Sequence, residues 1–197
     1  MNGPGTETSS GGTTEFSTVN PTPDNRTSPF SEYRYDISRT DDFLVTIRLD
    51  VVSSSYNQLD AGLTFSAFGG TAGFPVSDRS NNVAILADRI QFGDGGSPYL
   101  MNTTTFHTYS MRYLGGTLQV YVDASSADIF GGTAVPVMSR SAIAGKTPGV
   151  IVFGDATNDP NYNSDYIVDY VTVEPIPEPG SLMLAGLGAL GLMRRRR

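Results

Sequence analysis

Apolar and polar residues alternate along most of this chain. Between Phe43 and Val51 an apolar side chain stands at every second position, and this period of two holds over nine residues. Such a period puts successive side chains on opposite faces, which predicts a β-strand with one buried face. The same texture returns in short segments separated by turn-forming glycine, asparagine, aspartate and proline. The further strands expected are residues 61–68, 83–87, 89–92, 106–113, 117–122, 133–138, 149–153 and 166–173.

The clearest local element is a hairpin around Gly115 and Gly116. These glycines lie between residues 106–113 and 117–122 and supply the positive φ angles of a tight turn, so the two strands are expected to pair antiparallel. No segment of the body keeps a 3.6-residue period over more than two turns, which makes the fold all-β. Nine or more half-buried strands need a second sheet to cover them. We therefore expect a two-sheet antiparallel sandwich over residues 30–173.

Residues 1–29 differ from the body in composition. They are mostly glycine, serine, threonine, proline and asparagine, and such a segment buries too little apolar surface to offset the entropy of ordering. We expect a disordered N-terminal lead. Residues 1–20 also contain neither the basic region nor the apolar region of an export signal. Three explanations are open for an exported chain without a visible signal: the natural start lies further upstream, the chain is a fragment, or export follows another route. The first is favoured, because low-complexity residues commonly follow a signal peptide.

Residues 106–123, FHTYSMRYLGGTLQVYVD, are similar to the central hairpin of laminin-G-like and concanavalin-like jelly rolls. The later residues 152–155, VFGD, and 169–171, DYV, also fit that pattern. The resemblance implies a jelly-roll sandwich across roughly the whole body, from residue 30 to residue 173. It specifies a fold rather than an activity, because folds of this kind host many functions.

The last residues, 174–197, combine three physically distinct pieces. Pro175, Pro177 and Pro179 remove backbone donors and keep the chain extended. Residues 182–193 are uncharged and apolar, and the four arginines 194–197 follow them, as at the cytoplasmic end of a membrane segment. Twelve helical residues reach only about 18 Å, against a hydrocarbon core of about 30 Å. We therefore expect a short apolar helix that enters the membrane temporarily as a sorting segment and is not a permanent anchor. An amphipathic or buried terminal helix is the other interpretation, disfavoured because the run has no polar face and four arginines follow it.

This order of pieces resembles the PEP-CTERM sorting signal of Gram-negative bacteria, which is recognised by exosortase, a membrane protease-transpeptidase. The resemblance implies that Pro177, Glu178 and Pro179 are the sorting signal. It further implies transient insertion into the inner membrane, followed by delivery to the outer surface or the extracellular matrix. The implied membrane segment contains Leu182, Met183, Leu184, Leu187, Leu190, Leu192 and Met193, and the implied cytoplasmic flank is Arg194, Arg195, Arg196 and Arg197.

Charge and cysteine content exclude several classes of function. The chain has 20 acidic and 13 basic residues and a net charge of −7, so its surface repels phosphates and a nucleic-acid-binding role is not expected. It has no cysteine. Disulfide scaffolds, cysteine zinc sites and cysteine nucleophiles are therefore excluded.

The body lacks the residue patterns of the common hydrolases. Polysaccharide-cleaving jelly rolls use paired carboxylates, but the only glutamate between residues 30 and 173 is Glu32. The only histidine is His107, which lies in an expected strand and has no serine elbow to serve. We therefore expect a hydrogen-bonded structural histidine and a non-enzymatic protein, with a secreted polysaccharide hydrolase as a remaining alternative.

One loop, residues 154–165, is rich in oxygen ligands. Asp155, Asn158, Asp159 and Asp165 are candidate Ca²⁺ ligands on this turn-rich segment. It lacks the order of an EF-hand loop. Asp and Asn also favour turns for their own sake, so a solvated loop is the other interpretation.

A carbohydrate-binding role is the first alternative to a structural one. Tyrosines of the body offer flat faces that can stack on sugars, although the chain has no tryptophan. The sequence as a whole favours an exported, non-enzymatic cell-surface or extracellular-matrix protein. Its expected partners are an exosortase and, for a matrix protein, an exopolysaccharide.

Overall fold

The computed structural model describes residues 6–17, 32–36, 42–54, 63–66, 82–93, 95–142, 150–155 and 164–176. Within these residues the chain forms thirteen strands and one short helix. In chain order they are β1 (Thr6–Ser10), β2 (Thr13–Ser17), β3 (Glu32–Asp36), β4 (Phe43–Ser54), β5 (Leu63–Ser66), β6 (Asn82–Leu86), β7 (Arg89–Phe92), β8 (Tyr99–Leu100), β9 (His107–Leu114), β10 (Thr117–Val122), α1 (Ser126–Gly131), β11 (Met138–Ser141), β12 (Val150–Asp155) and β13 (Ser164–Pro175).

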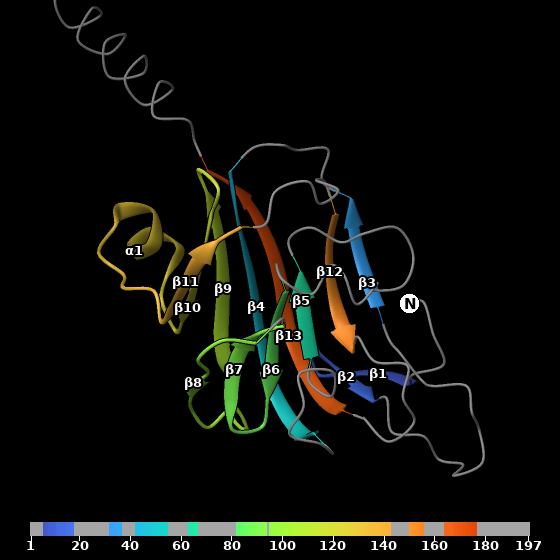
Figure 1. The fold of residues 1–197 in the computed structure, drawn as a ribbon. Coiled ribbons are helices and arrows are strands. Elements are labelled where there is room, and N and C mark those ends of the chain that lie inside the picture. The colour runs from blue at the N-terminus through green and yellow to red at the C-terminus, as the bar shows by residue number, and fades with distance from the viewer. Residues whose placement is uncertain are drawn as a thin grey trace, which may run out of the picture.

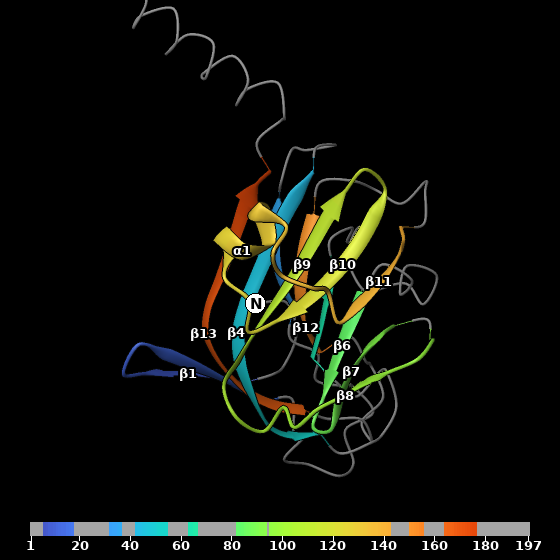
Figure 2. The ribbon, with the colours of Figure 1, turned by 90° about the vertical axis from the view of Figure 1, so that its left-hand side faces the viewer.

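The strands form two antiparallel sheets that pack face to face (Figures 1 and 2). The seven-stranded sheet has the order β1-β2-β13-β4-β9-β10-β11, and the six-stranded sheet has the order β3-β12-β5-β6-β7-β8. Long strand β4 lies between β13 and β9 in the middle of the larger sheet. The expected all-β, two-sheet sandwich is confirmed.

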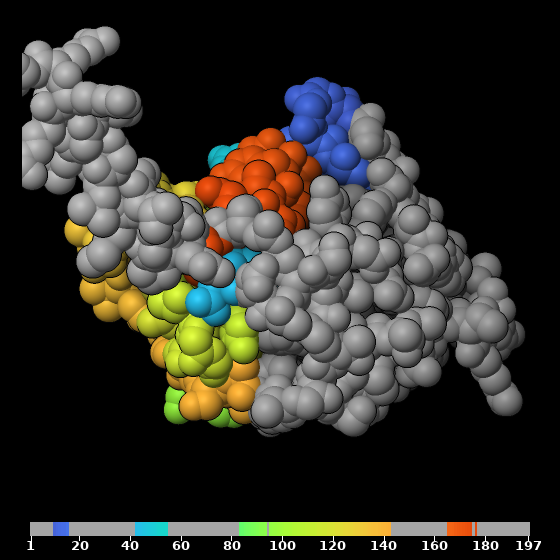
Figure 3. Space-filling view, turned by 90° about the horizontal axis from the view of Figure 1, so that it is seen from above, coloured from blue at the N-terminus to red at the C-terminus, as the bar shows by residue number. Residues whose placement is uncertain are grey.

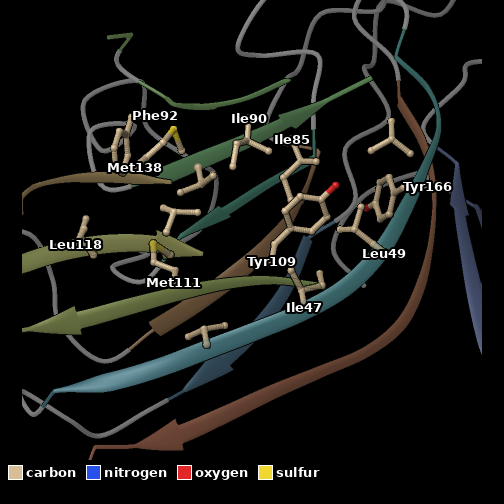
Figure 4. Close-up of a cluster of buried hydrophobic side chains, with 14 of the residues drawn as sticks. Ile47, Leu49, Ile85, Ile90, Phe92, Tyr109, Met111, Leu118, Met138 and Tyr166 are labelled. Carbon is tan, nitrogen blue, oxygen red and sulfur yellow. The ribbon is translucent and has the colours of Figure 1, made fainter. Parts of the chain in front are cut away.

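The core lies between the two sheets and follows the alternation seen in the sequence. On β4 the inward side chains from Phe43 to Val51 are at most 2% exposed, and they pack against Ile85 and Ile90 of the other sheet (Figure 4). This burial of one strand face against the opposite sheet is what a period of two requires. The buried residues of this cluster are Phe43, Val45, Ile47, Leu49, Val51, Val83, Ile85, Ile90, Phe92, Tyr109, Met111, Leu118, Val120, Met138, Tyr166 and Val168.

The hairpin predicted around Gly115 and Gly116 is confirmed. Strands β9 and β10 pair antiparallel, with Leu114 opposite Thr117. The two glycines between them have φ values of +54° and +80°, which residues with a side chain rarely adopt. The turn therefore depends on both glycines, as a primed turn does.

The outer face of the larger sheet is covered at one end by α1, which the sequence did not predict. Leu44 and Tyr121 point away from the main core and are buried there against Ile129 of the helix. The expectation that β4 has a single buried face is therefore wrong at Leu44. The helix escaped prediction because six residues are too short to show a 3.6-residue period.

Two expected boundaries are also wrong. Residues 6–17 lie within the expected disordered lead, yet they form the β1–β2 hairpin, and β2 extends the larger sheet by pairing with β13. Backbone hydrogen bonding to β13 explains how a mostly polar segment, with Phe16 as its one large apolar residue, joins the sheet. Residues 133–138 do not form a strand, because β11 begins only at Met138. Gly132 ends α1 in the left-handed region, and Pro136 lacks a backbone donor for the ladder.

The expected apolar helix at residues 182–193 lies outside the described residues. Among the helices in the described part of the chain, none has the length and apolar character needed to cross a membrane.

Candidate functional site

The C-terminal end of the sandwich is held to the sheet by several hydrogen bonds. Strand β13 pairs with β4 up to its last residue, with Glu174 opposite Leu44 and Pro175 opposite Phe43. The backbone N–H of the next residue, Ile176, donates a hydrogen bond of 3.1 Å to the carbonyl oxygen of Asp42. The last described residue of the chain is therefore still fixed to the sheet.

Two side-chain contacts reinforce this end of β13. Asp42 Oδ1 accepts a hydrogen bond of 2.9 Å from the backbone N–H of Gly115, in the β9–β10 turn. Ser126 Oγ, at the start of α1, donates a hydrogen bond of 2.8 Å to Glu174 Oε1. We call Asp42, Gly115, Ser126, Glu174 and Ile176 the junction clamp. Seen from above, β13, the start of β4 and the β9–β10 turn gather at this end of the molecule (Figure 3).

The residues expected to form the sorting signal follow the junction clamp directly. Pro177 is the next residue after Ile176, and Glu178 and Pro179 complete the tripeptide. These residues, the apolar run 182–193 and the arginines 194–197 lie outside the described residues. The sequence showed the motif but gave no signal for the clamp, because Asp42 and Ser126 belong to no recognisable pattern.

A second candidate site is a cleft of about 560 Å³ between the turn after β7 and edge strand β11. We call it the edge cleft. Phe92 and Met138, 7% and 8% exposed, supply apolar surface, and they lie side by side in Figure 4. The guanidinium carbon of Arg140 lies 5.2 Å from the centre of the Phe92 ring. The lining residues are Phe92, Gly95, Gly96, Ser97, Val137, Met138, Ser139 and Arg140.

The chemistry of the edge cleft suits a small polar ligand with one apolar face. The guanidinium of Arg140 lies over the ring of Phe92 and Ser97 stands beside it, and such a mixture of polar groups and apolar surface is usual in a ligand pocket. The turn beside it contains Gly95 and Gly96, with φ values of +104° and +98°. The amide of Gln91 donates a hydrogen bond of 2.6 Å to the carbonyl oxygen of Gly96 and braces this turn. The pattern of apolar and polar residues in the sequence gave no signal for this cleft.

His107 is engaged on both sides of its ring. Its Nδ1 lies 2.6 Å from Asp123 Oδ2, and its Nε2 lies 3.2 Å from Thr105 Oγ1. The other carboxylate oxygen of Asp123 accepts a hydrogen bond of 2.9 Å from the backbone N–H of Thr108. These contacts tie the start of β9 to the end of β10, which supports the structural role expected for this histidine.

The candidate calcium ligands are only partly described. Asn158 and Asp159 lie outside the described residues, and Asp155 is the last residue of β12. Asp165 Oδ2 accepts a hydrogen bond of 3.0 Å from Ser53 Oγ, whereas its Oδ1 is buried without a hydrogen-bond partner. Among the residues that can be placed, no group of three or more His, Cys, Asp or Glu side chains could hold a metal. Calcium binding by the loop stays a prediction.

Comparison with known protein families identifies the C-terminal segment. Residues 175–197 match the PEP-CTERM protein-sorting motif. The chain therefore carries this motif, as its sequence pattern suggested, and such a motif marks an exported protein that is recognised by an exosortase. A search of curated proteins finds no match.

The fold is that of concanavalin-like lectins and related jelly rolls. A native glycosidic hydrolase superimposes with a TM-score of 0.53 at 19% identity, over 87% of this chain and 81% of that one. The calcium-bound exoplasmic/lumenal domain of VIP36 superimposes with a TM-score of 0.53 at 10% identity, over 88% of this chain and 82% of that one. The form of that domain bound to Ca²⁺ and Man3GlcNAc superimposes with a TM-score of 0.52 at 10% identity, over 89% of this chain and 87% of that one. At these identities the likeness establishes the jelly-roll fold alone.

Proposed function

We propose that this chain is a non-enzymatic protein of the cell surface or extracellular matrix of a Gram-negative bacterium, sorted there by an exosortase. The observation that carries the proposal is the PEP-CTERM motif at residues 175–197, which continues directly from the last strand of a folded sandwich. The sandwich is then the exported domain, and the motif is the segment that the exosortase recognises and cuts.

The three pieces of the motif divide the work by their chemistry. The arginines 194–197 stay on the cytoplasmic side, because moving charge through hydrocarbon is costly. The apolar residues 182–193 occupy the inner membrane, and their short length favours a temporary stay. Pro177, Glu178 and Pro179 present extended backbone to the protease, because prolines prevent a competing helix or sheet.

Expression of tagged variants in a strain with an exosortase tests this proposal. For Glu178→Gln and for deletion of residues 194–197, we expect unprocessed protein in the inner membrane, whereas the unaltered chain gives a shortened form outside it. Glu15→Gln is the matched control, since Glu15 is an exposed carboxylate on β2. A mature C-terminus near Pro179 in the Glu178→Gln variant, found by mass spectrometry, would contradict the proposal. So would normal processing in a strain without exosortase.

A second candidate function is carbohydrate binding, which the edge cleft favours. Its apolar surface beside hydroxyl and guanidinium groups suits a sugar ring, and its volume of about 560 Å³ falls in the range of small-molecule sites. Calorimetric titration of the full chain with the host exopolysaccharide tests this role. We expect saturable binding that Arg140→Ala weakens and Ser141→Ala, a change outside the cleft on the same strand, leaves intact. New reducing ends during such a titration would instead indicate a hydrolase.

A further inference from the structure

The residues just before the sorting tripeptide already have backbone partners in the folded protein. Glu174 and Pro175 lie in the ladder between β13 and β4, and the N–H of Ile176 is bonded to Asp42. Glu178 is only two residues beyond Ile176. At about 3.3–3.6 Å per residue, covalent geometry keeps it within roughly 7 Å of the clamped backbone.

A protease that binds an extended peptide needs the backbone of several residues for its own hydrogen bonds. One N–H cannot serve the carbonyl of Asp42 and the enzyme at the same time. Cutting at the motif while the sandwich is folded therefore requires residues 174–176 to leave the sheet first. Such an opening is a local unfolding event, and its equilibrium depends on the contacts that hold the segment.

The contacts at this end of the molecule oppose such an opening. Asp42 is tied through Oδ1 to Gly115, and Glu174 is tied through Oε1 to Ser126. Phe43, opposite Pro175, is 2% exposed, and its ring stacks on that of Tyr113 with 5.6 Å between centroids. The end of β13 is thus joined to β4, to the β9–β10 turn and to α1.

We infer that Asp42 is a positioning residue for the sorting reaction, because the junction clamp sets the rate at which the exosortase gains access to its motif. This inference rests on the proposed function. The folded body then restrains its own processing, and weakening the clamp accelerates it. Asp42 acts through the backbone of residues 174–176 and does not touch the scissile bond.

Pulse-chase labelling of the full chain in an exosortase-containing strain measures this rate. Asp42→Ala removes the bond to Gly115 and is expected to speed conversion by roughly three- to tenfold, the effect of losing one hydrogen bond. Asp42→Asn keeps an acceptor oxygen and is expected to process at the original rate. Six glycine and serine residues inserted between Ile176 and Pro177 move the motif away from the clamp. This insertion should speed conversion at least as much, and Asp42→Ala should add nothing to it.

Hydrogen exchange on the purified precursors provides a second measurement. The Ile176 amide should exchange faster in Asp42→Ala than in Asp42→Asn. Because the insertion changes no described residue, it keeps the inference testable even if Asp42→Ala folds poorly. An unchanged or slower rate of conversion for the insertion variant would overturn the inference and leave the sorting function intact. Such a result is expected if the exosortase cuts the chain before the sandwich folds. Absence of processing in the unaltered chain would overturn both.

Discussion

His107 Nδ1 and Asp123 Oδ2 lie 2.6 Å apart and join the first residue of β9 to the residue that follows β10. Asp123 holds this position with a φ of +54°, the only positive φ among the described non-glycine residues. Asparagine and aspartate tolerate the left-handed region better than other residues with side chains. The carboxylate therefore both permits the turn and bonds to the strand beside it.

Substitutions of Asp123 should separate these two contributions. Asp123→Ala loses the bonds to His107 and Thr108 and keeps the unfavourable φ, so we expect a loss of about 1–3 kcal/mol in unfolding free energy. Asp123→Gly relieves the backbone and should lose less, and Asp123→Asn should lose least. Urea unfolding followed by circular dichroism gives these values. Equal stability of the alanine and asparagine variants would contradict the assignment.

Tyr109 carries a buried hydroxyl without a hydrogen-bond partner. Removing an unsatisfied polar atom relieves its desolvation, so Tyr109→Phe should be neutral or stabilising by about 1 kcal/mol. Tyr121→Phe is the control, because the hydroxyl of Tyr121 donates a bond of 3.1 Å to Gln119 Oε1. Its loss should cost about 0.5–1.5 kcal/mol. Destabilisation of both variants alike would show that Tyr109 has a partner.

Alkaline unfolding should depend on the same residue. Burial raises the pKa of Tyr109 far above its usual value, and the charges of Asp123 and Asp50 raise it further. The unfolded chain ionises near pH 10 while the folded chain keeps a neutral phenol, so stability is intact below pH 10 and falls as the pH rises above it. Tyr109→Phe should reduce this fall. Parallel pH profiles of melting temperature for the two proteins would contradict the assignment.

Helix α1 should contribute to stability through one side chain. Ile129 is fully buried against Leu44 and Tyr121. Ile129→Ala is expected to lower the unfolding free energy by about 2–5 kcal/mol, since it removes apolar contacts and leaves a cavity. Val135→Ala, at an 83% exposed position just after the helix, should change it by less than about 0.5 kcal/mol. Similar melting temperatures for the two variants would show that the helix does not cover the sheet in solution.

Acid should weaken the start of α1. The hydroxyl of Ser125 donates a hydrogen bond to the carboxylate of Asp128 and lowers its pKa. A second hydrogen bond, from the hydroxyl of Thr133, lowers this pKa further. The pKa of an aspartate in the unfolded chain is about 3.9, and above that pH a carboxylate with a lower pKa in the folded chain stabilises the fold. This contribution is lost as the pH falls through the pKa of the folded state. Asp128→Asn should therefore show a shallower fall in urea midpoint between pH 6 and pH 2. An unchanged slope would count against this contribution.

Much of the sandwich could be predicted because its strands bury one face. Residues 89–92 and 117–122 form β7 and β10 with the predicted bounds. The β1–β2 hairpin could not be predicted, because its residues are mostly polar and its place depends on the backbone edge that β13 offers. Over residues 133–138 the opposite happened, because a strand was expected and most of it does not form. The apolar residues after α1 do not join the sheet until Met138.

By itself, the sequence determined the alternating strands, the two-glycine hairpin and the sorting motif, because each is a local pattern whose meaning depends only on neighbouring residues. The tertiary structure alone decided the covering of Leu44 and Tyr121 by α1, the lining of the edge cleft and the junction clamp. In the clamp, Asp42 meets Gly115 across 73 positions and Ser126 meets Glu174 across 48. Contacts of that range arise only when sheet register brings distant backbone together, and no periodicity in the chain encodes them.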